Sequence, residues 1–190
     1  MRRCVKSGIF CMTLAALGSL AVRPASAQSI AEPNTWTVTP FLGTSIGLSD
    51  PADSNSLGLG VAVAYDWTSN LGFEGELSYL FDVAGDTADL DWSVTNVSGN
   101  AVYHFDVRRV TPYATFGIGF ERSGLDIKNP DILALYPASS TEISYNFGGG
   151  VKYPLTPRLI ARGDVRRVNA NDLAPDYWRL YGGLTFRVGR

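Results

Sequence analysis

The sequence has only two cysteines among its 190 residues, Cys4 and Cys11, and both lie close to its start. The residues around them match the pattern of a signal peptide. Positively charged residues at the N-terminus are followed by the apolar run 9–22 and then by the small-residue cleavage motif Ala25-Ser26-Ala27. We therefore expect residues 1–27 to be cleaved off. The mature chain would then have no disulfide, so core packing or another form of closure must stabilise its fold.

Long apolar runs are also missing. The run 9–22 is shorter than the roughly 20 residues of a transmembrane helix, which makes a retained anchor the weaker interpretation. No later run is long enough for such a helix, so any membrane crossing would require a closed β-barrel. Without the first 27 residues, 12 of the 16 Lys and Arg residues remain against 18 acidic ones, a formal charge of −6. This acidic balance gives no indication of a nucleic-acid partner.

Alternation of apolar and polar residues is what the chain has in abundance. Residues 71–83 are apolar at every second position except Gly75, and polar between them except at Leu80. A period of two predicts a β-strand with one apolar and one polar face. The same alternation predicts seven further strands, at residues 35–48, 56–67, 90–105, 111–122, 142–153, 158–168 and 177–189. The period changes near Thr95-Asn96, which predicts a β-bulge there.

The strand lengths and connections favour a membrane barrel. Most of these strands exceed the usual length of about five to six residues and match the roughly nine to eleven tilted residues that cross a bilayer. Short turns at 68–70, 106–110 and 154–157 alternate with mostly longer loops at 49–55, 84–89, 123–141 and 169–176. This asymmetry is typical of outer-membrane barrels, in which an even strand number leaves both termini on the periplasmic side.

The aromatic residues indicate which face meets lipid. In an up-and-down barrel they would form two belts around a band of mostly Leu, Val, Ile, Ala and Gly, which matches the two interfaces of a bilayer. The periplasmic belt would contain Trp36, Trp67, Phe73, Tyr103, Phe105, Tyr153 and Phe186, and the outer belt Tyr79, Phe81, Trp92, Phe120, Tyr145 and Trp178. The predicted fold is an all-β, eight-stranded antiparallel transmembrane barrel over residues 35–190, after a periplasmic lead at 28–34. A soluble periplasmic ligand-binding barrel is the third interpretation, after a narrow channel.

Charged residues on the polar faces would then point into the barrel. The third and seventh strands lie across the lumen from each other, and their charges overlap in depth. We expect an interior ion-pair network of Glu74, Glu76, Arg162, Asp164 and Arg166. An eight-stranded barrel is just wide enough for side chains to fill, and it tolerates paired charges better than unpaired ones. The alternative is a narrow passive channel for ions or small solutes.

The longest predicted connection, 123–141, has apolar residues where solvent is expected. They are Ile132, Leu133, Leu135 and Tyr136. One interpretation is a single helical turn after Asn129-Pro130-Asp131 that packs on the barrel mouth or on lipid headgroups. The other is a surface that contacts a host molecule or a partner protein.

Several motifs of this chain resemble motifs of the small eight-stranded outer-membrane barrels of Gram-negative bacteria. These barrels form the OmpA/OmpX-type or outer membrane protein β-barrel domain group. The motifs are Asn100-Ala101-Val102-Tyr103-His104-Phe105, Thr111-Pro112-Tyr113 with Gly117-Ile118-Gly119, Ala161-Arg162-Gly163-Asp164-Val165-Arg166, and the last strand. The resemblance implies a monomer at the cell surface, with the bilayer and lipopolysaccharide around it. It also implies that the assembly machinery recognises the last strand through Tyr181, Gly183, Phe186 and Val188, although the chain ends in Arg190 instead of an aromatic residue.

Enzymatic interpretations have little support. Some barrels of this size resemble lipid A deacylases, which need a Ser–His pair, but Asp106 stands where that serine would follow the single histidine, His104. A mature chain with one histidine and no cysteine has no metal-ligand cluster. Glu74 and Glu76 project from one face of one strand, unlike the opposed carboxylates of a glycosidase. We therefore expect no catalytic residue, metal or cofactor, and interpret His104 as an interior polar residue.

Overall fold

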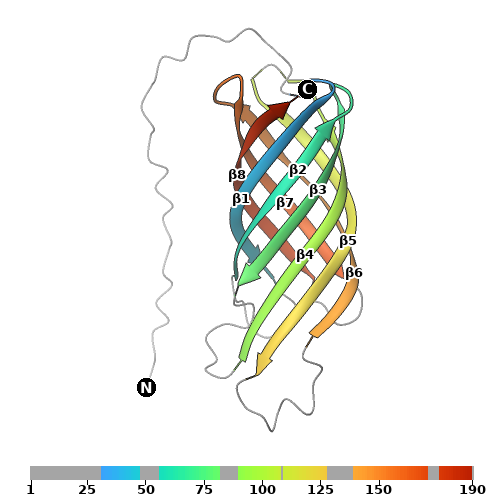
Figure 1. Ribbon diagram of the computed structural model, residues 1–190, viewed down its shortest axis with the longest axis vertical. Helices are drawn as coiled ribbons and strands as arrows, with labels where there is room; N and C mark the ends of the chain where they lie inside the picture. Colours follow the sequence, from blue (N-terminus) through green and yellow to red (C-terminus); the bar gives the residue numbers. More distant parts are fainter. Residues whose placement is uncertain are drawn as a thin grey trace, which may run out of the picture.

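A closed antiparallel barrel of eight strands forms the protein (Figure 1). The computed structural model describes residues 31–47, 56–81, 90–107, 109–127, 139–170 and 176–189, with the backbone alone for residues 90–92 and 125–127. Each strand pairs with its neighbours in sequence, and the first strand closes on the last. Among these residues, no helix is long and apolar enough to cross a membrane. The predicted all-β, eight-stranded up-and-down barrel is confirmed.

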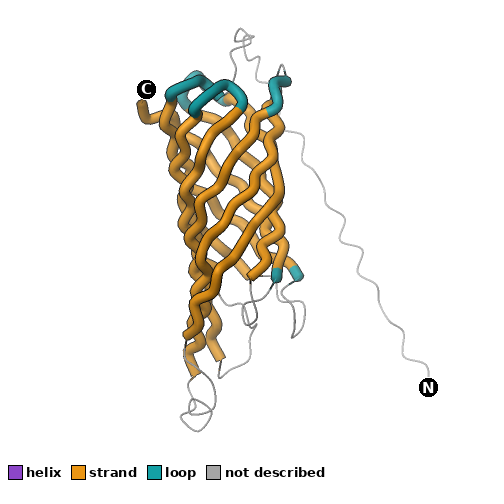
Figure 2. The backbone as a smooth tube through the Cα atoms, turned by 90° about the vertical axis from the view of Figure 1, so that its right-hand side faces the viewer, coloured by secondary structure: helices purple, strands orange, loops and turns teal. Residues whose placement is uncertain are grey.

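The strands begin close to the predicted positions. They are β1 (Thr35–Ile46), β2 (Ser56–Asp66), β3 (Leu71–Phe81), β4 (Leu90–His104), β5 (Thr111–Ile127), β6 (Ser139–Pro154), β7 (Leu159–Ala170) and β8 (Tyr177–Gly189). The main difference concerns the connection predicted at 123–141. Its two ends continue the β5–β6 ladder as far as the pair Gly124 and Ser139, because backbone pairing does not require apolar side chains. β4, β5 and β6 consequently project beyond the other strands (Figures 1 and 2).

The β-bulge predicted near Thr95-Asn96 is wrong. β4 pairs with both β3 and β5 without a register shift at these residues. The apolar period changes in the sequence because Val94 points into the barrel, where its side chain is 1% exposed. There it joins a small apolar cluster with Leu80, Val168 and Tyr177. Apolar residues at this level therefore lie on the inward face, and the strand itself is regular.

The two faces of each strand differ as the period of two requires. On β3, the outward side chains of Phe73 and Leu77 are each 49% exposed, whereas the inward Glu74 and Glu76 are 3% and 4% exposed. Apolar side chains thus cover the outside of the barrel, and polar side chains fill its interior. This is the arrangement of a barrel in lipid and the reverse of a soluble ligand-binding barrel.

Outward aromatic residues gather near both ends of the strands. At the end with the short turns, Trp67 and Phe73 have ring centroids 6.3 Å apart, and those of Tyr103 and Phe105 are 5.1 Å apart. At the other end the rings of Tyr79 and Phe81 lie 4.7 Å apart. The side chain of Trp92 lies outside the described part of the chain.

The residues before β1 pack against the end of the barrel that carries the short turns. Asn34, with a φ of 59°, donates its backbone N–H to the carbonyl oxygen of Asp66 at 2.7 Å and accepts a hydrogen bond from the Tyr65 hydroxyl at 2.8 Å. Ala31 is buried, and Glu32 lies 3.5 Å from Arg187. Part of the predicted lead therefore belongs to the barrel. The predicted signal peptide, residues 1–27, lies outside the described residues.

Candidate functional site

Six charged side chains occupy the middle of the barrel interior. Each is at most 4% exposed, and three are positive and three negative, so the set carries no net charge. We call this set the central network; its members are Glu74 and Glu76 from β3, Arg162, Asp164 and Arg166 from β7, and Arg179 from β8. The structure thus brings together the five residues of the expected network and adds Arg179.

Glu74 receives hydrogen bonds from both arginines of β7. The Nη1 and Nη2 atoms of Arg162 donate to its Oε2 and Oε1 atoms, the second at 3.1 Å. Arg166 Nη2 donates to Glu74 Oε1 at 2.8 Å. A bidentate hydrogen-bonded contact between a guanidinium group and a carboxylate is among the strongest interactions between protein side chains. Since β3 and β7 lie on opposite walls, these contacts cross the lumen.

Asp164 lies between the two arginines on the inward face of β7. It accepts hydrogen bonds from Arg166 Nε at 2.9 Å and from Arg162 Nη2 at 3.0 Å. The period of two along a strand places residues 162, 164 and 166 on one face, so the carboxylate separates two guanidinium groups that would otherwise repel each other.

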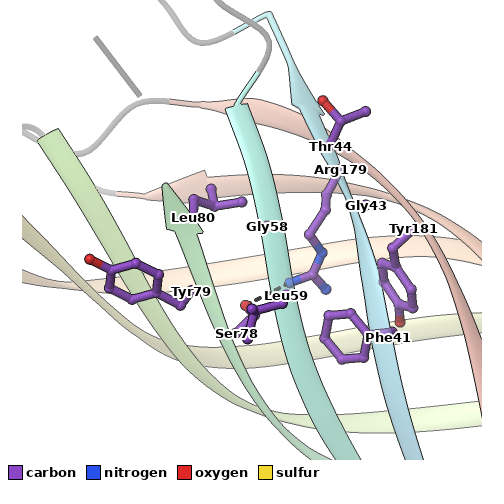
Figure 3. A pocket seen from close by; sticks show the side chains of 10 residues that line it. All are labelled: Phe41, Gly43, Thr44, Gly58, Leu59, Ser78, Tyr79, Leu80, Arg179 and Tyr181. Carbon is purple, nitrogen blue, oxygen red and sulfur yellow. Dashed lines mark hydrogen bonds between the residues drawn. The ribbon is translucent and has the colours of Figure 1, made fainter. Parts of the chain in front are cut away.

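Glu76 and Arg179 extend the network toward the outer end of the barrel. The Oε1 atom of Glu76 lies 2.7 Å from Arg179 Nη1, and its Oε2 atom lies 3.1 Å from Arg166 Nη1. Neither oxygen has a hydrogen-bond partner among the described residues, so these are ion pairs without directional bonds. Arg179 Nη1 also donates to Ser78 Oγ at 3.0 Å (Figure 3).

Two tyrosines complete the packing around the arginines. The Tyr113 hydroxyl donates to Asp164 and accepts from Arg162 Nε at 2.7 Å, while the Tyr181 hydroxyl accepts from Arg166 Nη2 at 2.9 Å. Their ring centroids lie 4.9 Å from the Arg162 guanidinium carbon and 5.0 Å from that of Arg179, respectively, which are cation–π distances. Tyr113 was not among the residues predicted for the network, although the alternation of residues along β5 places its side chain on the inward face.

A second polar group lies nearer the periplasmic end. Lys152 Nζ lies 2.9 Å from His104 Nε2, and His104 Nδ1 lies 4.0 Å from Asp66 Oδ1. All three side chains are buried inside the barrel. His104 is therefore an interior residue shielded from both lipid and water, where a substrate in the membrane does not reach it.

The outer end of the interior is more apolar. Glu121 is fully buried there and accepts hydrogen bonds from Tyr177 at 3.2 Å and from Asn96 at 3.4 Å. The apolar cluster that contains Val94 packs at this level. Beside Arg179, Phe41 and Tyr181 the interior leaves a cavity of about 10 Å³ (Figure 3), close to the minimum for one water molecule. At this level the described side chains leave little free space in the interior.

The remaining predicted contact residues cannot be placed. Ile132, Leu133, Leu135 and Tyr136 lie outside the described residues, in the connection between β5 and β6. In the described ranges, no group of three or more His, Cys, Asp or Glu side chains is arranged to hold a metal ion.

Comparisons with known proteins agree with this architecture. Neisserial surface protein A shares 16% identity, covering 82% of this chain and 97% of its own, with a TM-score of 0.66. The N-terminal β-barrel domain of Pseudomonas aeruginosa OprF shares 21% identity over 82% and 98%, with a TM-score of 0.56. Ail, the attachment invasion locus protein of Yersinia pestis, shares 14% identity over 82% and 99%, also with a TM-score of 0.56. These likenesses show the fold.

The sequence itself was also compared with family models and with curated proteins. The comparison with curated proteins gave no match. The family model for the outer membrane protein beta-barrel domain matches residues 12–187, which is most of the chain. The chain therefore belongs to the outer membrane protein β-barrel domain family and is a transmembrane barrel of the outer membrane.

Proposed function

We propose that the protein is a closed, non-conducting barrel with a structural or surface-interaction role and no enzymatic activity. The observation that carries this proposal is the position of Arg166 in the middle of the interior. Its side chain is 0% exposed and contacts Glu74, Glu76 and Asp164, so it joins opposite walls of the barrel. A water-filled path through the barrel could open only if these ion pairs separated. Breaking a buried pair by removing one partner costs about 3–5 kcal/mol.

The levels on either side of the central network support the same proposal. Toward the outside, the apolar cluster of Leu80, Val94, Val168 and Tyr177 packs beside Glu121, which accepts a hydrogen bond from the Tyr177 hydroxyl. Toward the periplasm, Lys152 and His104 fill the interior, and Ala31 packs against that end. An ion would have to displace three successive layers of packed side chains.

The surface role that we propose rests on the outer ends of β4, β5 and β6. These strands project beyond the others (Figure 1). In the sequence, the connection between β5 and β6 contains Ile132, Leu133, Leu135 and Tyr136. Ail, which shares the fold, is named for attachment and invasion and was also solved in complex with a heparin analogue. For the present chain, we propose that this projecting part contacts lipopolysaccharide or a host molecule.

Two further proposals concern assembly. We propose that the barrel is a monomer in the bilayer, because the pairing of β1 with β8 closes the barrel wall and leaves no edge strand within that wall. We also propose that the assembly machinery recognises β8, whose outward face carries spaced hydrophobic side chains. They are Trp178, Leu180, Leu184, Phe186 and Val188, all at least 42% exposed.

Planar-bilayer recording tests the closed-barrel proposal. Folded protein, verified by heat-modifiable migration on a gel, should give no steady current at high salt. A steady, salt-dependent conductance would refute the proposal and favour a narrow channel.

Deletion of residues 132–136 tests the surface role separately. Cells that display the shortened barrel should adhere less to a host-cell layer than cells with the intact protein, at equal surface levels. Unchanged adhesion would reject the contact with a host molecule and leave the closed-barrel proposal unaffected.

A further inference from the structure

A hollow lies in the lipid-facing surface of the barrel over β2 to β5. Its floor consists of Gly75 and Gly99, which pair across β3 and β4, together with Ala101. A Cβ atom added to Gly99 would meet no atom within 4 Å, and one added to Gly75 would meet only the Val63 carbonyl oxygen at 4.0 Å. The volume of the hollow is about 550 Å³. The two glycines therefore leave a space that no neighbouring side chain fills.

Large apolar side chains surround this floor. Val63 on β2 pairs with Gly75, and Ile118 on β5 pairs with Gly99, so the four residues form one row across the strands. In the next row toward the periplasm, Phe73 and Phe116 lie on either side of Ala101. Trp36 lines the hollow from β1. The shape is thus a trough with small residues at its base and bulky residues along its sides.

Few of the residues that line the trough are polar, and the hydroxyl of one of them, Tyr65, already donates a hydrogen bond to Asn34 Oδ1. Glu74 and Asn100 also border it, but their side chains point into the barrel. There Glu74 is bonded to both arginines of β7, and Asn100 Oδ1 accepts a hydrogen bond from Asn146 at 2.9 Å. A polar ligand would lose hydrogen bonds on entering this site, because its donors and acceptors would find few partners there. A hydrocarbon has no donors or acceptors and does not pay this cost.

The size and location of the trough identify its occupant. A volume of about 550 Å³ falls within the roughly 300–1,000 Å³ of small-molecule sites. The trough is continuous with the apolar outer surface that faces the bilayer, and Trp36 and Phe73 place it in the periplasmic half of that surface. We propose that it is a binding site for one acyl chain of a phospholipid in the periplasmic leaflet.

The physical basis is packing and not the hydrophobic effect, because both the free and the bound chain are in hydrocarbon. On a smooth barrel wall, an acyl chain contacts protein on one side only. In the trough it contacts the floor and both walls, and each additional pair of heavy atoms contributes about 0.1–0.2 kcal/mol of dispersion energy. The bound chain therefore exchanges more slowly than its neighbours.

Quenching of Trp36 by brominated lipid tests this site. A variant that keeps only Trp36, with Trp67, Trp92 and Trp178 replaced by Phe, is folded into phosphatidylcholine vesicles in which a small fraction of the acyl chains is brominated at mid-chain. The reference is the same protein with G75L and G99L, which fill the trough. At each brominated fraction, the unfilled protein should show more quenching than this reference, because a chain held in the trough keeps its bromine atoms near Trp36; this difference is the excess.

The barrel offers a matched control on its opposite side. Gly163 and Gly182 pair across β7 and β8, and the nearest atoms to their added Cβ atoms lie at 4.0 and 3.9 Å. In the same single-tryptophan protein, G163L with G182L should leave the excess quenching unchanged. If the double variant in the trough does not fold, G99V alone should reduce the excess.

Two results would overturn the proposal. One is equal quenching before and after the trough is filled. The other is chemical crosslinking of a dimer that G75L with G99L abolishes, since the occupant would then be a second copy of the chain.

Discussion

Arg166 and Glu74 lie on opposite walls of the barrel, 92 positions apart in the sequence, and are joined by a hydrogen bond of 2.8 Å from Arg166 Nη2 to Glu74 Oε1. Arg166 also contacts Asp164 and Glu76. Each of these carboxylates is fully or almost fully buried, so the arginine compensates charges that water cannot reach. This relationship leads to the first prediction.

Replacing Arg166 with Leu should destabilise the barrel by about 3–5 kcal/mol, because it leaves buried carboxylates short of a positive partner. Urea unfolding of the protein in lipid vesicles measures the loss. R167L is the matched control one residue away, since Arg167 faces outward and its ion pair with Asp176 is partly exposed. That variant should lose about 1 kcal/mol or less. Equal losses would contradict the assigned role of Arg166.

Glu76 and Arg179 should be energetically coupled. E76Q and R179Q each leave one uncompensated charge, whereas the double variant removes both, so its loss should be smaller than the sum of the single losses. A double-mutant cycle measured by urea unfolding should give a coupling energy of about 0.5–3 kcal/mol. Additive losses would mean that the 2.7 Å approach of the two groups contributes nothing to stability.

The hydroxyl of Tyr113 should contribute measurably. Y113F removes the group that accepts from Arg162 Nε and donates to Asp164, and an unsatisfied buried partner costs about 1–3 kcal/mol. The outward-facing Tyr153 is 47% exposed, which makes Y153F a control with the same chemical change. Thermal unfolding followed by gel migration should show a lower transition for Y113F only. A similar shift in both variants would argue against the hydrogen bonds.

Gly150 should not tolerate a side chain. An added Cβ would lie 2.0 Å from the Gly163 carbonyl oxygen and 2.6 Å from the Tyr113 hydroxyl. G150A should therefore destabilise the barrel by about 1–3 kcal/mol through overpacking. G99A is the control, because no atom lies within 4 Å of its added Cβ, and it should be neutral in the same unfolding measurement. A neutral G150A would show that the strand shifts at no cost.

The alternation of residues predicted the eight strands. Strand lengths and the pattern of turns and loops predicted the membrane barrel, and the aromatic belts predicted that its apolar face points outward. These predictions were also sufficient to place Glu74 at the depth of Arg162 and Arg166, because strand count and direction determine which strands face each other. The partnership of Glu76 with Arg179 was not predictable in this way. It depends on the tilt of β8 relative to β3, which is a property of the whole ladder and leaves no local pattern.

The apolar residues that point into the barrel were also not predicted from the sequence. Val94 and Phe41 lie in the interior, and there they pack against Tyr177 and Tyr181, respectively. A rule that assigns apolar residues to lipid and polar residues to the lumen misplaces them, and this produced the incorrect bulge. At levels of the interior that hold no charged side chains, apolar side chains fill the space. Only the folded structure shows which levels these are.

The distribution of the central network over β3, β7 and β8 has a consequence for how the protein reaches its folded state. Glu74 and Glu76 are synthesised well before the arginines of β7 and β8, and the network is complete only when the last strand is in place. An incomplete sheet in the membrane would hold arginines and carboxylates without their partners, which is costly in hydrocarbon. Insertion of the interior charges is therefore coupled to closure of the β1–β8 seam, and partly assembled barrels should be scarce.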